Sequence, residues 1–105
     1  MAKYHLTNKA VDDLAGIWEY TFDNWSENQA DKYYHILIDS FNEIASKPQI
    51  GRLYLEIVDN LKGYQVGKHI VFYRVIENYN VEIIRILHER MDLKNRITEN
   101  VYPYR

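Results

Sequence analysis

Two helical stretches come first along the chain. Between residues 8 and 24, apolar side chains recur every three or four positions while most acidic side chains fall elsewhere around the axis, which predicts a helix with one buried face. Ser26 begins a second helical pattern as an N-cap, because Gln29 stands three residues later as in a capping box. Pro48 ends that pattern. Residues 8–46 are therefore predicted to form an αα-hairpin, preceded by a short strand over residues 3–6.

The second half of the chain changes to a strand-like period. A short strand over 63–66 and a turn at Gly67 lead into a second strand over 69–76, and turn residues then precede a third strand over 81–87. The last two strands are apolar on both faces, which suits strands in the interior of a sheet. The fold class is therefore predicted as α+β, with the helical hairpin packed on one face of a small, mostly antiparallel sheet.

The turn between the last two strands fixes their expected register. A symmetric turn centred between Asn78 and Tyr79 places His69 opposite His88, Phe72 opposite Arg85, and Arg74 opposite Ile83. In that register Arg74 and Arg85 share one face along a diagonal.

The length of 105 residues suits one domain over residues 1–105. The end of the chain has a weaker pattern: it has room for one helical turn over Asp92–Ile97 before Pro103, and residues 93–105 are expected to form a flexible tail. There is no cysteine, which excludes disulfides, thiolate metal sites and cysteine nucleophiles. The chain opens without a signal-peptide pattern and has no run of membrane-spanning length, so we expect a cytoplasmic protein with no membrane partner.

The formal net charge of −2 is unevenly divided along the chain. Residues 1–46 carry three basic and eight acidic side chains, whereas residues 47–105 carry ten basic and seven acidic ones. Tight binding to a phosphate backbone needs many uncompensated cations. We therefore expect little direct binding of nucleic acid by this chain alone, although the basic residues gather on the strands and the tail.

The candidate chemistry is limited. Four histidines are present, but none has the spacing of a metal site with a third ligand, so we expect no metal and no cofactor, and a cross-strand pair of His69 and His88 that merely packs. Metal-independent RNA cleavage needs cations, a proton carrier and an aromatic ring. The residues that could supply these are Arg74, Arg85, His88, Lys62 and Tyr64. The simpler interpretation is that the arginines form ion pairs with acids such as Asp59, Glu82, Glu89 and Asp92.

Five segments, in order, carry a family resemblance. Three lie in or just after the predicted hairpin: Leu14-Ala15-x-Ile17-Trp18-x-Tyr20, Trp25-Ser26-x-x-Gln29-Ala30 and Lys47-Pro48-x-Ile50-Gly51-Arg52. Two more specific ones lie in the predicted sheet: Gly67-x-His69-Ile70-Val71-Phe72-Tyr73-Arg74-Val75 and Ile84-x-Ile86-Leu87-His88-x-Arg90-Met91-Asp92. Over residues 4 to about 98 the chain resembles ParE-type toxins of the RelE/ParE superfamily.

The resemblance implies the RelE/ParE-like fold and the toxin of a type II toxin–antitoxin module, of the kind that stabilises plasmids. It also implies neutralisation by a ParD-like antitoxin and DNA gyrase as the target, bound by a protein that is not an enzyme. RelE-like relatives are instead ribosome-dependent mRNA endonucleases, and fold alone does not separate the two branches. The ribonucleases usually carry an arginine three positions before the tyrosine of the second central strand, where this chain has Ile70. A non-toxic partner and co-repressor of the antitoxin is a further alternative.

The resemblance also suggests contact residues. Those expected to meet the target are Arg74, Arg85, His88, Arg90, Met91 and Asp92, with the tail to Arg105. The alternative for the last of the six is structural, with Asp92 capping the following turn. Those expected to meet the antitoxin, as an amphipathic helix or an added strand, are the tyrosines that exceed the needs of a small core, Tyr33, Tyr34, Tyr54 and Tyr64.

Overall fold

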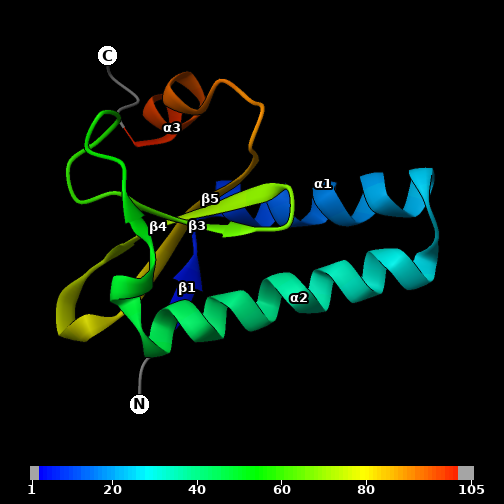
Figure 1. Cartoon of the computed structure of the whole chain (residues 1–105), viewed down its shortest axis with the longest axis horizontal. Helices are drawn as coiled ribbons and strands as arrows, with labels where there is room; N and C mark the ends of the chain where they lie inside the picture. The colour runs from blue at the N-terminus through cyan, green and yellow to red at the C-terminus, as the bar shows by residue number, and fades with distance from the viewer. Residues whose placement is uncertain (1–2, 102–105) are drawn as a thin grey trace.

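The computed structural model describes residues 3–101, with side chains as far as Thr98. The elements follow in the order β1 (Tyr4–Leu6), α1 (Asn8–Asn24), α2 (Glu27–Ser46), β2 (Arg52–Leu53), β3 (Lys62–Val66), β4 (His69–Val75), β5 (Val81–His88) and α3 (Leu93–Val101), with 3₁₀ turns at Pro48–Ile50 and Glu77–Tyr79. Figure 1 shows α1 and α2 as a long hairpin on one side of the sheet and α3 on the other. The predicted α+β class and its helical hairpin are confirmed.

The sheet has five strands in the order β1-β5-β4-β3-β2. All its pairs are antiparallel except β1 with β5, which are parallel. The two central strands are β4 and β5, as their apolar character on both faces predicted. β2 was not predicted, because its two residues, Arg52 and Leu53, are both exposed and carry no alternating pattern.

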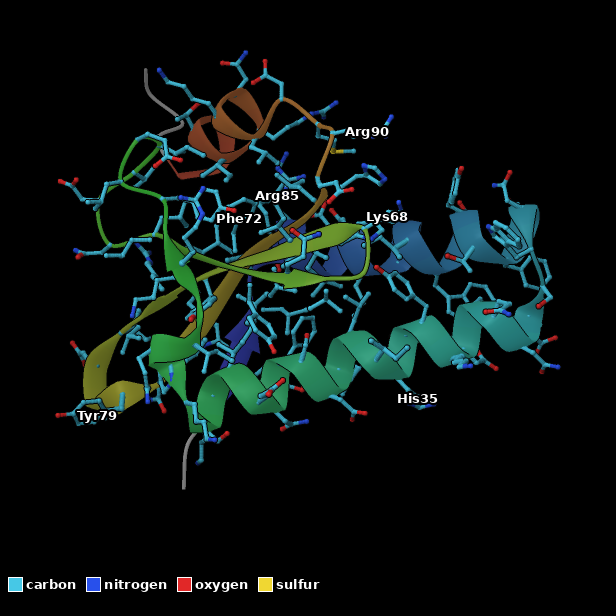
Figure 2. The ribbon with its side chains drawn as sticks, viewed as in Figure 1. His35, Lys68, Phe72, Tyr79, Arg85 and Arg90 are labelled. Carbon is cyan, nitrogen blue, oxygen red and sulfur yellow. The ribbon has the colours of Figure 1, made fainter. Side chains whose placement is uncertain are left out.

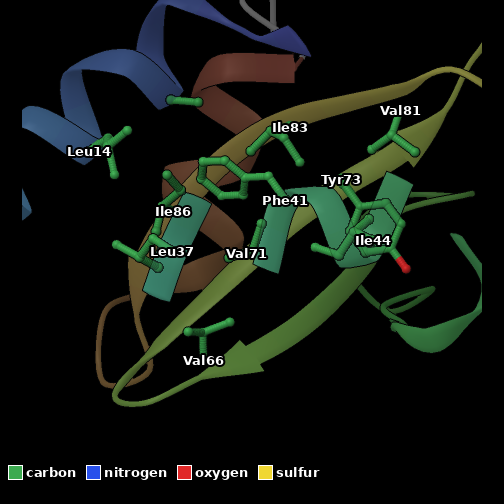
Figure 3. Close-up of a cluster of buried hydrophobic side chains, with 11 residues drawn as sticks. Leu14, Leu37, Phe41, Ile44, Val66, Val71, Tyr73, Val81, Ile83 and Ile86 are labelled. Carbon is green, nitrogen blue, oxygen red and sulfur yellow. The ribbon is translucent and has the colours of Figure 1, made fainter. Parts of the chain in front are cut away.

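Both helices of the hairpin begin at the residues the sequence indicated. The side chain of Thr7 accepts a hydrogen bond from the backbone N–H of Ala10, and that of Ser26 accepts one from Gln29. The main core lies between this hairpin and the sheet, and Figure 3 shows Leu37, Phe41 and Ile44 of α2 directed at it. Leu37, Phe41 and Ile44 are completely buried, so the hairpin is fixed against the sheet by packing.

A second apolar cluster covers the opposite face of the sheet. Ile97 of α3 is completely buried there, and Phe72 of β4 and Leu87 of β5 face it. This corrects the expectation for the end of the chain: in place of one turn over Asp92–Ile97, a helix runs from Leu93 to Val101. The part of the expected tail at residues 102–105, which includes Pro103, lies outside the described residues.

A β-bulge changes the register of the central strands. His69 pairs with His88 and Phe72 with Arg85, as predicted, but the register then shifts by one residue. Arg74 consequently stands opposite Glu82 rather than Ile83, which corrects the predicted pairing. The extra residue leaves Ile84 in the cluster that faces α3.

Candidate functional site

A cleft of about 590 Å³ lies between α1 and the far end of β5. α1 forms one wall, the ends of β4 and β5 form the floor, and the segment leading to α3 closes the third side. The residues that line it are Asp12, Asp13, Gly16, Ile17, Tyr20, Thr21, His69, Arg85, Ile86, Leu87, His88, Arg90, Met91 and Arg96. In Figure 2, Arg85 and Arg90 lie toward α3, and Tyr79 marks the opposite end of the β4–β5 ribbon.

The wall at α1 is anchored where β5 loses its neighbouring strand. β1 ends at Leu6, opposite Ile83, so the edge of β5 beyond that point needs other partners. Thr7 supplies one, since its hydroxyl donates to the carbonyl of Ile84 at 2.8 Å. Asp13 of α1 supplies another, because its Oδ2 accepts the backbone N–H of Ile86 at 3.0 Å. The side chains of Thr7 and Asp13 thus make hydrogen bonds to β5 at positions where it has no neighbouring strand on that edge.

Arg85 completes this anchor. Its Nε and Nη2 donate to the two carboxylate oxygens of Asp13 at 2.7 and 2.8 Å, a bidentate pair whose side chains are 9% and 14% exposed. Its Nη1 donates to the carbonyl of Arg96 in α3 at 3.1 Å. One buried guanidinium therefore links α1, β5 and α3, and we call this arrangement the Arg85 clasp.

Two imidazoles lie side by side in the floor. The rings of His69 and His88 are 5.4 Å apart between centroids and nearly perpendicular. The single proton of the Tyr33 hydroxyl goes to the carbonyl of Val66 at 3.0 Å, so the same oxygen accepts from Nδ1 of His69 at 2.8 Å. Nδ1 of His88 accepts the backbone N–H of Arg90 at 3.1 Å, which leaves the ring proton of neutral His88 on Nε2.

Burial decides the charge of His69. It lowers the pKa of His69 to about 4, and the neighbouring His88 adds to the effect, while Asp13 and Glu89 oppose it. Burial also raises the pKa of Tyr33, although a backbone hydrogen bond from Lys68 opposes that shift. At neutral pH His69 and Tyr33 are both uncharged.

The turn between β3 and β4 makes room for Tyr33. Gly67 has a φ of 57°, and a Cβ there would lie 2.8 Å from the tyrosine hydroxyl. Both the backbone conformation and the close approach require glycine at this turn.

Of the six residues expected to meet the target, four line the cleft and two do not. Arg85, His88, Arg90 and Met91 all line the cleft. Arg74 does not, because its Nε donates to Glu82 at 2.8 Å near the other end of the ribbon. Asp92 does not either: its carboxylate accepts from Nδ2 of Asn95 at 2.7 Å and from the backbone N–H of Asn95 at 3.4 Å at the start of α3. Its geometry is that of the structural alternative, a cap. The tail to Arg105 extends beyond the described residues.

The four tyrosines expected to meet the antitoxin do not form one exposed aromatic surface. Of the four, only Tyr34 is exposed, at 38%. Tyr33 packs against the main core, and the ring of Tyr54 lies edge-on to Phe72 with centroids 5.1 Å apart. Tyr64 donates its hydroxyl to Glu43 at 3.0 Å and lines a smaller groove of about 300 Å³ between α2 and β3. The number of tyrosines was a poor guide to exposed aromatic surface, because three of the four contact neighbouring side chains of this small domain.

Sequence reasoning missed three of the residues that shape the cleft, Asp13, Gly16 and Arg96. A signal existed for Asp13, which borders the apolar stripe of α1 instead of lying opposite it. For Arg96 no signal existed, because its place depends on the full length of α3. Between residues 3 and 98, no three histidine, aspartate or glutamate side chains are grouped so as to hold a metal ion. No helix over the described part of the chain is long and apolar enough to cross a membrane.

Among the solved structures that share this fold are one of a ParDE toxin–antitoxin system and one of the toxin RelE. The chain resembles a chromosomal ParDE toxin–antitoxin structure from P. aeruginosa with a TM-score of 0.71 and 17% identity, over 84% of this chain and 96% of that one. It resembles a mutant of the E. coli toxin RelE in the free state with a TM-score of 0.68 and 13% identity, over the whole of both chains. At these identities the likeness defines the fold that the two groups share.

Sequence comparison is more specific. The chain is 33% identical to Toxin ParE1 of Mycobacterium tuberculosis over 96 residues, which are 91% of this chain and 98% of the relative. It is 35% identical to Toxin ParE1 of Caulobacter vibrioides over 94 residues, 90% and 96% of the two chains. Residues 4–93 match the family model of the ParE toxin of the type II toxin–antitoxin system parDE. The chain belongs to this ParE toxin family.

Proposed function

We propose that this toxin inhibits DNA gyrase by binding it through the cleft, without catalysing a reaction, and that a ParD-like antitoxin neutralises it. The observation that carries the proposal is that the ParE family match runs through both central strands, whose ends form the floor of the cleft. The arginines considered for RNA cleavage also support a binding role. Arg85 is held in the clasp and Arg74 lies outside the cleft, so neither guanidinium is positioned to stabilise a phosphorane there.

The test is a supercoiling assay with purified toxin and gyrase. We expect inhibition at micromolar toxin, and full recovery when the antitoxin is added in equal amount. Arg74→Gln serves as the control, because this residue lies outside the cleft, and it should inhibit as the wild type does. Supercoiling that continues unchanged at micromolar toxin would remove gyrase as the target.

A second candidate function, cleavage of mRNA on the ribosome, has one observation in its favour. His88 lies in the same cleft as Arg90, whose guanidinium has no hydrogen bond or ion pair with any residue between 3 and 98. Primer extension on translated messages after induction separates the two functions. Cleavage at codons supports the endonuclease, whereas intact messages with DNA damage support gyrase inhibition. Induction with no growth defect, alongside tight antitoxin binding, points to the co-repressor.

For the antitoxin, we propose docking at the rim formed by α2 and β3. Ile36 is 43% exposed there and lines the smaller groove together with Tyr64. β2 pairs only with Lys62 and Gly63, so within the described residues the edge of β3 from Tyr64 to Val66 has no neighbouring strand. An amphipathic helix in the groove or a strand added to this edge fits that geometry.

Ile36→Asp tests this docking site, with Val11→Asp on the outside of α1 as a matched control, since Val11 is 51% exposed and lines neither groove. We expect the antitoxin affinity to fall about tenfold or more for Ile36→Asp and to stay unchanged for the control. Equal affinities for both variants, with an antitoxin footprint that avoids the hairpin and the sheet rim, would contradict the site.

A further inference from the structure

Gly16 stands in the middle of α1, where the fold itself gives no reason for a glycine. A Cβ built on Gly16 would meet no atom within 4 Å outside its own helix. The other three glycines are different, because in each case a tyrosine ring occupies the place of a side chain: Tyr73 at Gly51, Tyr54 at Gly63 and Tyr33 at Gly67. Glycine in a helix interior destabilises the fold relative to alanine. What Gly16 does provide is bare helix backbone in the wall of the cleft.

The cleft beneath Gly16 combines an apolar floor with free cations. Ile17, Ile86 and Met91 line it, and apolar surface dominates its interior. Arg90 and Arg96 also line it, and neither guanidinium makes a hydrogen bond or an ion pair with a side chain between residues 3 and 98. This arrangement suits an apolar side chain next to a carboxylate, because the first fills the floor and the second gives the guanidinium groups a bidentate partner.

The same wall disfavours a nucleic-acid strand. Asp12 and Asp13 line the cleft on α1, and only Asp13 is neutralised, by Arg85. Residues 1–46, which include this wall, carry eight acidic and three basic side chains, so a chain of phosphates running past α1 would be repelled. A single carboxylate, by contrast, can pair with Arg90 and Arg96, which come from the segment after β5 and from α3 rather than from α1.

We propose that the cleft binds an extended segment of the toxin's protein target, with its main chain against α1 at Gly16, an apolar side chain on Ile86 and Met91, and a carboxylate on Arg90 and Arg96. The identity of that target rests on the proposed function. We choose the target as the occupant because the groove proposed for the antitoxin lies between α2 and β3 and shares no lining residue with this cleft. Gly16 is then explained as the point of closest approach between the two main chains.

Substitutions at Gly16 separate this role from a structural one. Gly16→Ala should raise the melting temperature by about 4 °C, because alanine is the better helix former and nothing obstructs its methyl group. Gly16→Leu should fold as well as the wild type and weaken inhibition of the target about tenfold or more, because the side chain blocks the approach. Ala15→Leu is the matched control, since Ala15 is exposed on α1 outside the cleft and should inhibit normally.

A direct binding measurement makes the test independent of gyrase. The probes are acetyl-Leu-Glu-Leu-amide and the same peptide with glutamine or lysine in the middle, titrated into the ¹⁵N-labelled toxin. We expect the glutamate peptide to shift the amide signals of Gly16 and Met91 and to bind about fivefold more tightly than the glutamine peptide, with the lysine peptide weakest. Gly16→Leu and the double variant Arg90→Gln/Arg96→Gln should each abolish this preference.

The outcomes are distinct. If the wild type does not inhibit gyrase but the glutamate peptide binds as expected, the proposed function fails and the ligand chemistry of the cleft stands. If gyrase is inhibited equally by the wild type and Gly16→Leu, and no peptide shifts Gly16, the inference is overturned and the function stands. If Gly16→Leu weakens only antitoxin binding, or only a self-association seen by sedimentation, the cleft belongs to the antitoxin or to a second copy, and the proposal is wrong.

Discussion

In the middle of the β4–β5 ribbon Arg85 pairs with Asp13, and near its turn end Arg74 pairs with Glu82. The shortest contacts are almost equal, at 2.7 and 2.8 Å. The exposed fractions of the side chains differ much more. The side chains of Arg85 and Asp13 are 9% and 14% exposed, whereas that of Arg74 is 48% exposed. In Figure 2, Arg85 lies toward α3, and Tyr79 marks the turn at one end of the ribbon.

The distance between the charged atoms is therefore a poor guide to how much an ion pair contributes to stability. In the buried pair, Asp13 also accepts the backbone N–H of Ile86, and Arg85 also donates to the carbonyl of Arg96. The pair therefore joins three elements and shapes the cleft. In the exposed pair, Glu82 also contacts His5 of β1 at 3.4 Å, so its contacts join neighbouring strands at the surface. Desolvation makes the first pair costly to break, while water readily replaces the second.

The largest expected effect is the loss of the clasp. Arg85→Met leaves the carboxylate of Asp13 buried without its cation, so we expect the free energy of unfolding to fall by about 3–5 kcal/mol. Urea denaturation measures this change. The double variant Arg85→Met/Asp13→Leu should recover part of it, because no charge is left unpaired. A loss below about 1 kcal/mol for Arg85→Met would place the clasp in the same class as the surface pair.

A smaller effect concerns pH at the cleft end of the ribbon. The unfolded chain takes up a proton on His69 near pH 6.5, whereas burial beside His88 lowers the pKa of His69 in the folded protein to about 4. Between these values the unfolded state binds more protons, so the contribution of His69 to stability is complete above pH 6.5 and is lost as the pH falls to 4.

We expect this loss to be about 1–2 kcal/mol, less than the full linkage value because the ring is only half-buried and solvent screens it. Urea unfolding between pH 4 and pH 7 measures it. His69→Gln should flatten the pH dependence relative to the wild type, and His5→Gln, at the exposed middle residue of β1, should retain it. Parallel curves for His69→Gln and the wild type would show that His69 does not carry the dependence.

The smallest effect is expected at the turn end. Arg74→Ala removes an exposed contact to Glu82, so the free energy of unfolding should fall by less than about 1 kcal/mol. Because the pair is exposed, this small difference should shrink further in high salt. Urea denaturation at low and high ionic strength checks both statements. A loss of stability comparable to that of Arg85→Met would contradict the contrast between the two ion pairs.

The sequence was sufficient for most of the fold, because its signals were local. Caps at Thr7 and Ser26, the apolar periods of α1 and α2, and the two doubly apolar strands all follow from short-range rules. The bulge was not predictable, since nothing in the residues around Ile84 marks an extra position. That single residue moved Arg74 from Ile83 to Glu82.

The site was less predictable than the fold. The last strand motif contains Arg85, His88, Arg90 and Met91, which all line one cleft in the structure, but the partner of Arg85 lies 72 residues away in sequence. Such a pair depends on how α1 crosses the end of β5, which no local pattern encodes. The expected surface of four tyrosines failed for a related reason: whether an aromatic ring lies inside or outside a small domain depends on packing.

The central claim is that the cleft end of the ribbon is the working surface of the toxin. Inhibition of gyrase supercoiling by two doubly substituted toxins tests it, Arg90→Gln/Arg96→Gln in the cleft and Arg52→Gln/Arg74→Gln outside it. Both pairs remove the same charge, and all four arginines are exposed. We expect half-inhibition by the cleft variant to need about tenfold more toxin, while the variant outside the cleft inhibits as the wild type does. Equal inhibition by both variants, or a larger loss outside the cleft, would contradict it.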